Sequence, residues 1–272
     1  MPNQKGYRRA AIIFIVIWLA CVSVPLITMV VWAFNDSWPW PQLAPTAFSL
    51  RGMTSASHIA GNFGQVIILS IGIALSVSLL CVIVASLTAR ALVHHNFPGK
   101  HLWKFGVILP FIIPSSAFAM GVQSLFTRLG LSGTVIGVVL AVSIVVMPYA
   151  IAIMIDVTEA AGKKLEEQAS VLGANKWRTL RHAILPSLLP GILSAASLSY
   201  ILAFMQYFLV YLVGTGFVKT IAVVMFPFLA GADRTVGTAY ATVFVAISLA
   251  VFFLFNFIMK RCGVKEQVEF YH

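Results

Sequence analysis

Six long apolar segments constrain this chain more than any other feature of its sequence. Each is close to the roughly 20 residues that an α-helix needs to cross a bilayer. Hydrophobic residues make up 60% of the 272 residues and charged residues only 10%, whereas a soluble domain is about 25% charged. The sequence therefore predicts an all-α integral membrane protein with six transmembrane helices. The predicted helices cover about residues 10–34, 63–93, 104–126, 133–157, 187–213 and 237–260.

Local features refine two of these helices. The segment 10–34 follows basic residues such as Lys5, but it is too long for a signal-peptide core and no small-residue cleavage site stands out. We therefore expect it to be retained as the first helix. The segment 104–126 contains Pro110 and Pro114, and proline interrupts the hydrogen bonds of a helix. This third helix is expected to be bent or broken.

Lys and Arg are distributed unequally between the connecting segments. With the amino terminus placed inside the cell, only Arg51, Arg128, Lys219 and Arg234 fall outside. The cytoplasmic side then holds Lys5, Arg8, Arg9, Arg90, Lys100, Lys104, Lys163, Lys164, Lys176, Arg178, Arg181, Lys260, Arg261 and Lys265. This positive-inside pattern predicts that both termini are cytoplasmic. The same pattern explains the net charge of +10 by membrane topology and contact with lipid headgroups, rather than by binding of nucleic acid.

The predicted topology divides the chain into four parts. These are a cytoplasmic tail with the first helix (1–34), an external loop (35–62), a five-helix core (63–260) and a cytoplasmic tail (261–272). The core contains a long cytoplasmic loop at 158–186.

No residue pattern predicts a metal site or a catalytic centre. The three cysteines do not form a CxxC or a Cys/His spacing; they are Cys21, Cys81 and Cys262. A cluster of His94, His95 and His101 has no neighbouring Cys or carboxylate in its loop, and Lys100 and Lys104 would repel a cation. We interpret these histidines as solvated loop residues, and no catalytic residue is predicted.

The cytoplasmic loop carries a short polar segment that is predicted to be helical over 164–173. Glu166 and Glu167 lie in its first turns, where carboxylates complement the helix dipole. Gly173 is a suitable end because glycine enters the left-handed region without steric cost. A second short helix is expected to end before Pro186. The segment is either a helix lying on lipid or a docking surface, and its carboxylates and small central residues favour docking of a partner protein.

The same segment resembles the signature loop of the membrane subunits of binding-protein-dependent (type I) ABC importers. That signature reads Glu-Ala-Ala, three residues, Gly, nine residues, then Ile-x-Leu-Pro. Here Glu167, Ala169 and Gly173 match at the right spacing, followed by Leu185-Pro186. Gln168 replaces the middle alanine, and Ala183 replaces the isoleucine. The resemblance covers roughly residues 60–260 and also agrees in topology.

The resemblance implies that this loop is a coupling helix seated in a groove of a cytoplasmic ATPase subunit. The residues it assigns to the docking loop are Glu166, Glu167, Gln168, Ala169, Ser170, Leu172, Gly173 and Ala174. It further implies two ATPase subunits, a second permease subunit that is homologous or identical, an external solute-binding protein, and a place in the bacterial inner membrane. The permease fold of a type I importer is expected, with no catalysis by this chain.

The sequence independently assigns ATP hydrolysis to another chain. A phosphate-binding loop of the form GxxxxGK[ST] is absent; Gly99-Lys100 lacks both the preceding glycine and the following Ser or Thr. We therefore expect no cofactor on this chain, with ATP and Mg bound by the partner ATPase.

Polar residues within the spans are candidates for a translocation path. The best candidates are Ser115, Ser116, Gln123, Gln206 and Tyr207. Serine also joins helices to one another, and tyrosine also lies at membrane interfaces, so packing roles remain the alternative. Ion-coupled carriers usually keep ionisable residues within the bilayer, and here no Asp, Glu, Lys or Arg lies in the middle of a span. A secondary carrier or channel without an ATPase remains the alternative function.

The cargo is expected to be a small hydrophilic solute. The segment leading into Asn62-Phe63 and the end of the chain resemble the branch that handles polyamines, thiamine and ferric iron. Polyamine permeases tend to carry acidic residues where this chain has Gln206-Tyr207, which argues against a strongly cationic cargo.

Overall fold

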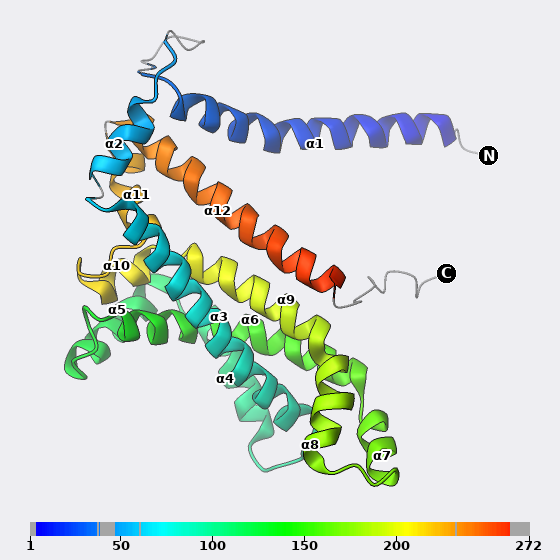
Figure 1. Cartoon of the computed structure of the whole chain (residues 1–272). Coiled ribbons are helices and arrows are strands. Elements are labelled where there is room, and N and C mark those ends of the chain that lie inside the picture. The colour runs from blue at the N-terminus through cyan, green and yellow to red at the C-terminus, as the bar shows by residue number, and fades with distance from the viewer. Residues whose placement is uncertain (1–3, 37, 39–46, 60, 232, 262–272) are drawn as a thin grey trace. The chain divides into compact units, whose positions relative to one another are not determined.

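The fold is almost entirely helical, as the apolar segments predict. The structure is a computed structural model, and it describes residues 4–36, 38, 47–59, 61–231 and 233–261. Its helices, labelled in Figure 1, are α1 (Gln4–Ala33), α2 (Arg51–Ile59), α3 (Phe63–His94), α4 (Lys100–Ile112), α5 (Ser115–Arg128), α6 (Val135–Ala161), α7 (Lys164–Val171), α8 (Lys176–Thr179), the π-helix η1 (Leu180–Ile184), α9 (Leu185–Phe204), α10 (Phe208–Gly214), α11 (Ile221–Ala230) and α12 (Arg234–Arg261).

Among the residues that the structure describes, five helical stretches are long and apolar enough to cross a membrane. They are Ala11–Ala33, Phe63–His94, Val135–Ala161, Lys176–Phe204 and Arg234–Arg261. The third predicted helix, 104–126, is instead divided between α4 and α5. The prediction that this segment is broken is confirmed, and the count of six crossings depends on this pair of short helices.

Pro114 accounts for the break between α4 and α5. It is the residue before α5, with φ −53° and ψ 128°, so its backbone is extended rather than helical. Proline also disfavours the helical conformation of the residue that precedes it, here Ile113. A new helix begins directly after Pro114.

The chain divides into two compact units. One comprises Met1–Phe63 with Val224–Ala246, and the other comprises Gly64–Val223 with Ile247–His272. In the first unit, Arg51 pairs with Asp36 at 3.3 Å and with Asp233 at 3.5 Å. The Tyr240 hydroxyl donates a hydrogen bond of 2.7 Å to the carbonyl of Ala56. These contacts hold α2 against the start of α12.

The second unit is organised around the contact between α6 and α9, the most extensive helix pair (Figure 1). Small residues allow this close approach. A Cβ added at Gly191 would lie 2.7–2.8 Å from three side-chain atoms of Val157. α3 joins the pair through hydrogen bonds from Ser78 Oγ to the Ala196 carbonyl (2.8 Å) and from Cys81 Sγ to the Ser143 carbonyl (3.7 Å).

The packing at Gly191 generates a stability prediction. Gly191→Ala should lower the free energy of unfolding by about 1–3 kcal/mol, because the added methyl group forces α6 and α9 apart. The matched control is Gly72→Ala in α3, where an added Cβ meets nothing within 4 Å and the better helix propensity of alanine should be neutral or stabilising. Thermal unfolding of the detergent-purified chain by circular dichroism measures both. Equal melting temperatures for the two variants would contradict this packing argument.

Candidate functional site

The predicted docking helix is present as α7, which follows α6 after a short turn. Gly162 has a φ of 63° and ends α6, with its N–H donating to the Thr158 carbonyl at 3.2 Å. α7 then begins at Lys164, with Glu166 and Glu167 in its first turn. These carboxylates lie where the helix dipole stabilises negative charge. The predicted helix over 164–173 is therefore confirmed to within two residues.

A hydrogen-bonded turn fixes the end of α7. Gly173 has a φ of 77°, and the N–H of Ala174 donates to the Ala169 carbonyl at 3.0 Å. This is the pattern of a Schellman C-cap, which needs a residue in the left-handed region. The prediction that Gly173 stops the helix is confirmed. Asn175 then caps α8, because its side-chain oxygen accepts from the Arg178 N–H at 2.8 Å.

The second helix of the loop differs from the prediction. It does not end before Pro186 but runs without interruption from Lys176 to Phe204. The π-turn η1 lies where the break was expected, and the N–H of Leu185 donates to the Leu180 carbonyl five residues earlier. A π-turn widens the helix, which accommodates a proline that cannot donate to its own i−4 carbonyl. A displacement of the loop can therefore be transmitted to α9 through one continuous helix.

The outer face of α7 is partly apolar. Glu167, Gln168, Val171 and Leu172 line a shallow depression that is open to solvent. Val171 is 87% exposed and Leu172 is 86% exposed. Ala169 is half-buried, and the side chain of Ser170 lies outside the described residues. Adjacent large apolar side chains exposed outside the predicted spans are typical of an interaction site.

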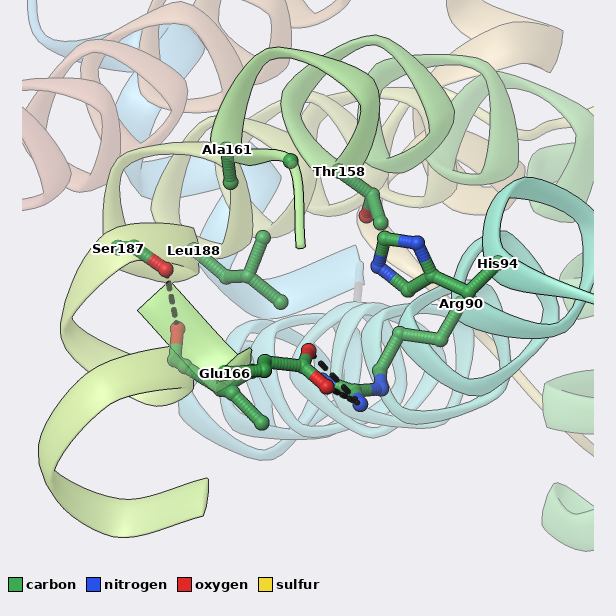
Figure 2. A pocket seen from close by; sticks show the side chains of 9 residues that line it. Arg90, His94, Thr158, Ala161, Glu166, Ser187 and Leu188 are labelled. Atoms are coloured by element: carbon green, nitrogen blue, oxygen red, sulfur yellow. Dashed lines mark hydrogen bonds and ion pairs between the residues drawn. The ribbon is translucent and has the colours of Figure 1, made fainter. Parts of the chain in front are cut away.

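Glu166 is half-buried and contacts α3, whereas Glu167 is exposed. The Glu166 carboxylate lies 3.0 Å from Arg90 Nη2, and Figure 2 shows the two groups pointing toward each other. Arg90 and Glu166 line a small pocket together with His94, Ile184 and Leu188. The interpretation of His94 as a solvated loop residue is wrong, because it is half-buried beside Arg90, whereas His95 and His101 are exposed.

Arg90 is a residue of this site that the sequence interpretation missed. In the sequence it contributes only to the positive-inside pattern. The available clue is that Arg90 carries the one Asp, Glu, Lys or Arg side chain within the long apolar helix α3. A single charge on such a helix needs a partner or access to water, but the sequence does not reveal which carboxylate supplies it.

The candidate path residues fall into two groups. Ser115 and Ser116 are exposed at the start of α5. Gln123 follows two turns later, and its Oε1 is buried with no hydrogen-bond partner among the described residues. Gln206 and Tyr207 lie in a break between α9 and α10, rather than within a continuous fifth helix. α10 packs against α5, so the two groups lie on neighbouring elements.

The candidate path residues carry hydroxyl, amide and aromatic groups. Across the described parts of the chain, no group of three or more His, Cys, Asp or Glu residues is placed to hold a metal ion. Tyr207 stacks on Tyr211 with ring centroids 5.9 Å apart. Groups of this kind can donate hydrogen bonds to a polar solute.

Comparison with known proteins places these features in a family. The family described as "Binding-protein-dependent transport system inner membrane component" matches residues 81–263. The putative 2-aminoethylphosphonate transport system permease protein PhnV of Salmonella typhimurium is 26% identical, over 97% of this chain and 98% of its own length. The sulfate transport system permease protein CysT of Escherichia coli is 28% identical, over 65% of this chain and 69% of its own length.

One further relative and one solved structure are also similar to this chain. The probable sulfate permease cysT of Chlorokybus atmophyticus is 31% identical, and the match covers 63% of this chain and 65% of that protein. These relatives do not point specifically to the polyamine, thiamine or ferric iron branch that the sequence suggested. A bacterial ABC transporter that imports the acidic polysaccharide alginate has the same fold, with a TM-score of 0.73 at 16% identity, over 96% of this chain and 98% of its own.

The match to the family covers well over half of the chain, and it includes α7, its Gly173 cap and the continuous helix into α9. The fold of a solved ABC importer extends the likeness to nearly the whole chain. The chain therefore belongs to the family of binding-protein-dependent transport system inner membrane components, and it is a membrane permease subunit of an ABC importer.

Proposed function

We propose that this permease subunit takes up its driving force through the outer face of α7, on which a separate ATPase subunit docks. The observation that carries the proposal is the exposed pair Val171 and Leu172 beside Glu167, on a helix whose end is fixed by Gly173. Burying two such side chains against a partner contributes favourably to binding. The capped end keeps this face in one orientation, so that a displacement of the ATPase becomes a displacement of α7.

A lipid-lying helix is the competing explanation for α7. Such helices carry a broad apolar face and a basic polar face. α7 opens with two carboxylates, and its exposed apolar residues lie at its C-terminal end. This distribution favours a protein partner over a lipid surface.

The proposed assembly has two ATPase subunits, a second permease subunit and an external solute-binding protein, in the inner membrane of a bacterium. ATP and Mg bind to the ATPase subunits. Closure of these subunits around ATP moves α7, and the solute path alternates between the outer and the cytoplasmic side. The supporting observation is the continuous helix Lys176–Phe204, which links the loop directly to α9.

The proposed cargo is a small oxyanion of the sulfate or phosphonate class. Sulfate and 2-aminoethylphosphonate are the solutes in the names of the relatives. The candidate path residues Ser115, Ser116, Gln123, Gln206 and Tyr207 include hydroxyl and amide donors and no carboxylate. Such donors suit an anion, whereas a carboxylate would repel it. The helix is interrupted at Met205–Tyr207, and transporters tolerate non-helical backbone at membrane depth where it lines a water-filled cavity or is buried in protein.

The docking proposal predicts the effect of removing the apolar pair. The double variant Val171→Ser/Leu172→Ser should weaken binding of the ATPase by about 2 kcal/mol or more, because the buried apolar area is lost. Co-purification of the ATPase with the permease, followed by a titration in detergent, measures this change. The control is Phe217→Ser, which changes an 83% exposed side chain in a segment expected outside. Equal ATPase affinity for both variants would reject the docking surface.

The cargo proposal predicts the effect of a charge in the break between α9 and α10. Gln206→Glu should reduce uptake of sulfate by about tenfold, since a like charge in a poorly solvated path costs at least roughly 1.4 kcal/mol. Uptake of radiolabelled sulfate and 2-aminoethylphosphonate into vesicles containing the complete complex measures it. Gln65→Glu, an exposed position of α3, controls for the added charge. Uptake of a polyamine but of neither oxyanion by the unaltered complex would show that the cargo is wrongly assigned.

A further inference from the structure

One ion pair connects the docking helix to a membrane-spanning helix far from it in sequence. Arg90 Nη2 lies 3.0 Å from Glu166 Oε1 and 3.3 Å from Oε2. Both side chains are 29% exposed, so water shields their interaction only in part. Figure 2 shows the Glu166 carboxylate directed at the Arg90 guanidinium.

A second contact lies within one turn of the first. Lys163 Nζ donates a hydrogen bond of 2.8 Å to the carbonyl of His94, the last residue of α3. A cation at the C-terminal end of a helix satisfies a free carbonyl and complements the helix dipole. The residues flanking the start of α7 are therefore attached to α3 at two points, Arg90 and His94.

The surroundings hold this connection in place. Arg90, His94, Thr158, Glu166, Ile184 and Leu188 line a pocket of only about 10 Å³, which is the lower limit for one water molecule. Arg90 Nη1 is also buried there, without a hydrogen-bond partner in the described part of the chain. Separating Glu166 from Arg90 would leave a poorly solvated charge, which is costly.

The ion pair gives α7 a second mechanical link to the predicted membrane-spanning helices. The first route is the continuous helix from α8 through η1 into α9, and α7 packs mainly against η1 and α8. The second route leads through Glu166 and Arg90 to α3, which is itself hydrogen-bonded to α9 through Ser78. Without the ion pair, α7 would push on α9 while its position relative to α3 was less restrained.

We propose that Arg90 is a positioning residue for energy coupling, which locks α7 to α3 through Glu166 so that both α3 and α9 move when the ATPase moves α7. The proposal rests on the proposed docking of the ATPase on α7. It divides the two neighbouring carboxylates by role: Glu166 faces inward and holds the helix to α3, whereas Glu167 lies on the docking face.

The test measures the distance between α3 and α8 in the complete transporter complex. Spin labels are placed at Leu87→Cys in α3, where the side chain is 66% exposed, and at the exposed Arg178→Cys in α8, after Cys21, Cys81 and Cys262 are changed to Ala. Pulsed electron paramagnetic resonance then gives the distance distribution without nucleotide and with ATP and vanadate. The unaltered pair should give one narrow population in each state.

The single reversals Arg90→Glu and Glu166→Arg should each abolish the narrow population in the ATP and vanadate state. The double reversal Arg90→Glu/Glu166→Arg should restore a distribution narrower than that of either single variant, as a double-mutant cycle requires for a direct interaction. Arg128→Gln and Asp156→Asn serve as controls. Both change exposed charged side chains that make no ion pair among the described residues, and they should leave the distribution unchanged.

The outcomes separate this proposal from the docking proposal. Narrow distributions in both single reversals, or no recovery in the double reversal, would overturn the role of Arg90. ATPase co-purification from the same samples should stay at the level of the controls, because the outer face of α7 is unaltered. Loss of co-purification in the single reversals would assign the pair to docking and would also overturn the role proposed here. Failure of the docking proposal is detected independently by the Val171→Ser/Leu172→Ser variant.

Discussion

The close contact between α6 and α9 is the interaction on which the α7 site depends. The docking loop leaves from the end of α6 and returns into α9, so the distance between its two ends is set by how these helices pack. Gly191 allows that packing because its missing side chain leaves room for Val157. The helices of the loop between them are capped at Gly162, Gly173 and Asn175, which leaves α7 few alternative positions. Because α6 and α9 are closely packed and the end of α7 is capped, a displacement of α7 can be transmitted to these two helices.

Polar interactions orient α7 relative to α3. In the membrane, charged side chains are costly and are retained where they are paired or reach water. Arg90 lies four residues before the end of α3 and meets Glu166 from the loop. The two neighbouring carboxylates of α7 thus lie on different sides, one toward α3 and one toward the open depression. The exposed Val171 and Leu172 extend that outer surface. An importer subunit that receives force from another protein needs both an outer contact and an inner attachment.

Local patterns in the sequence predicted much of this arrangement. The apolar segments, the break before α5, the helix at 164–173 and its stop at Gly173 follow from residue types within a few positions of one another. The ion pair between Arg90 and Glu166 did not follow, because its partners are 76 residues apart in sequence and meet only after α3 and the loop have folded. The π-turn before Pro186 was also missed, since a proline signal does not reveal whether a helix ends or widens. The family likeness is confirmed, whereas the relatives do not point specifically to the predicted branch; the cargo depends on a few side chains whose spatial arrangement the sequence leaves open. The domain boundaries, the orientation of the termini and the roles of the path residues stay predictions.

Hydrogen exchange of the permease with and without its ATPase tests the central claim most directly. α7 is a short helix whose end is held by the hydrogen bonds from Leu172 to Gln168 and from Ala174 to Ala169, and such a helix opens and exchanges readily on its own. If the ATPase docks on α7, amide exchange across 164–174 should slow markedly when the ATPase is added, while exchange in α2 on the predicted external side stays unchanged. Unchanged exchange across 164–174 in a complex that still contains bound ATPase would contradict the account.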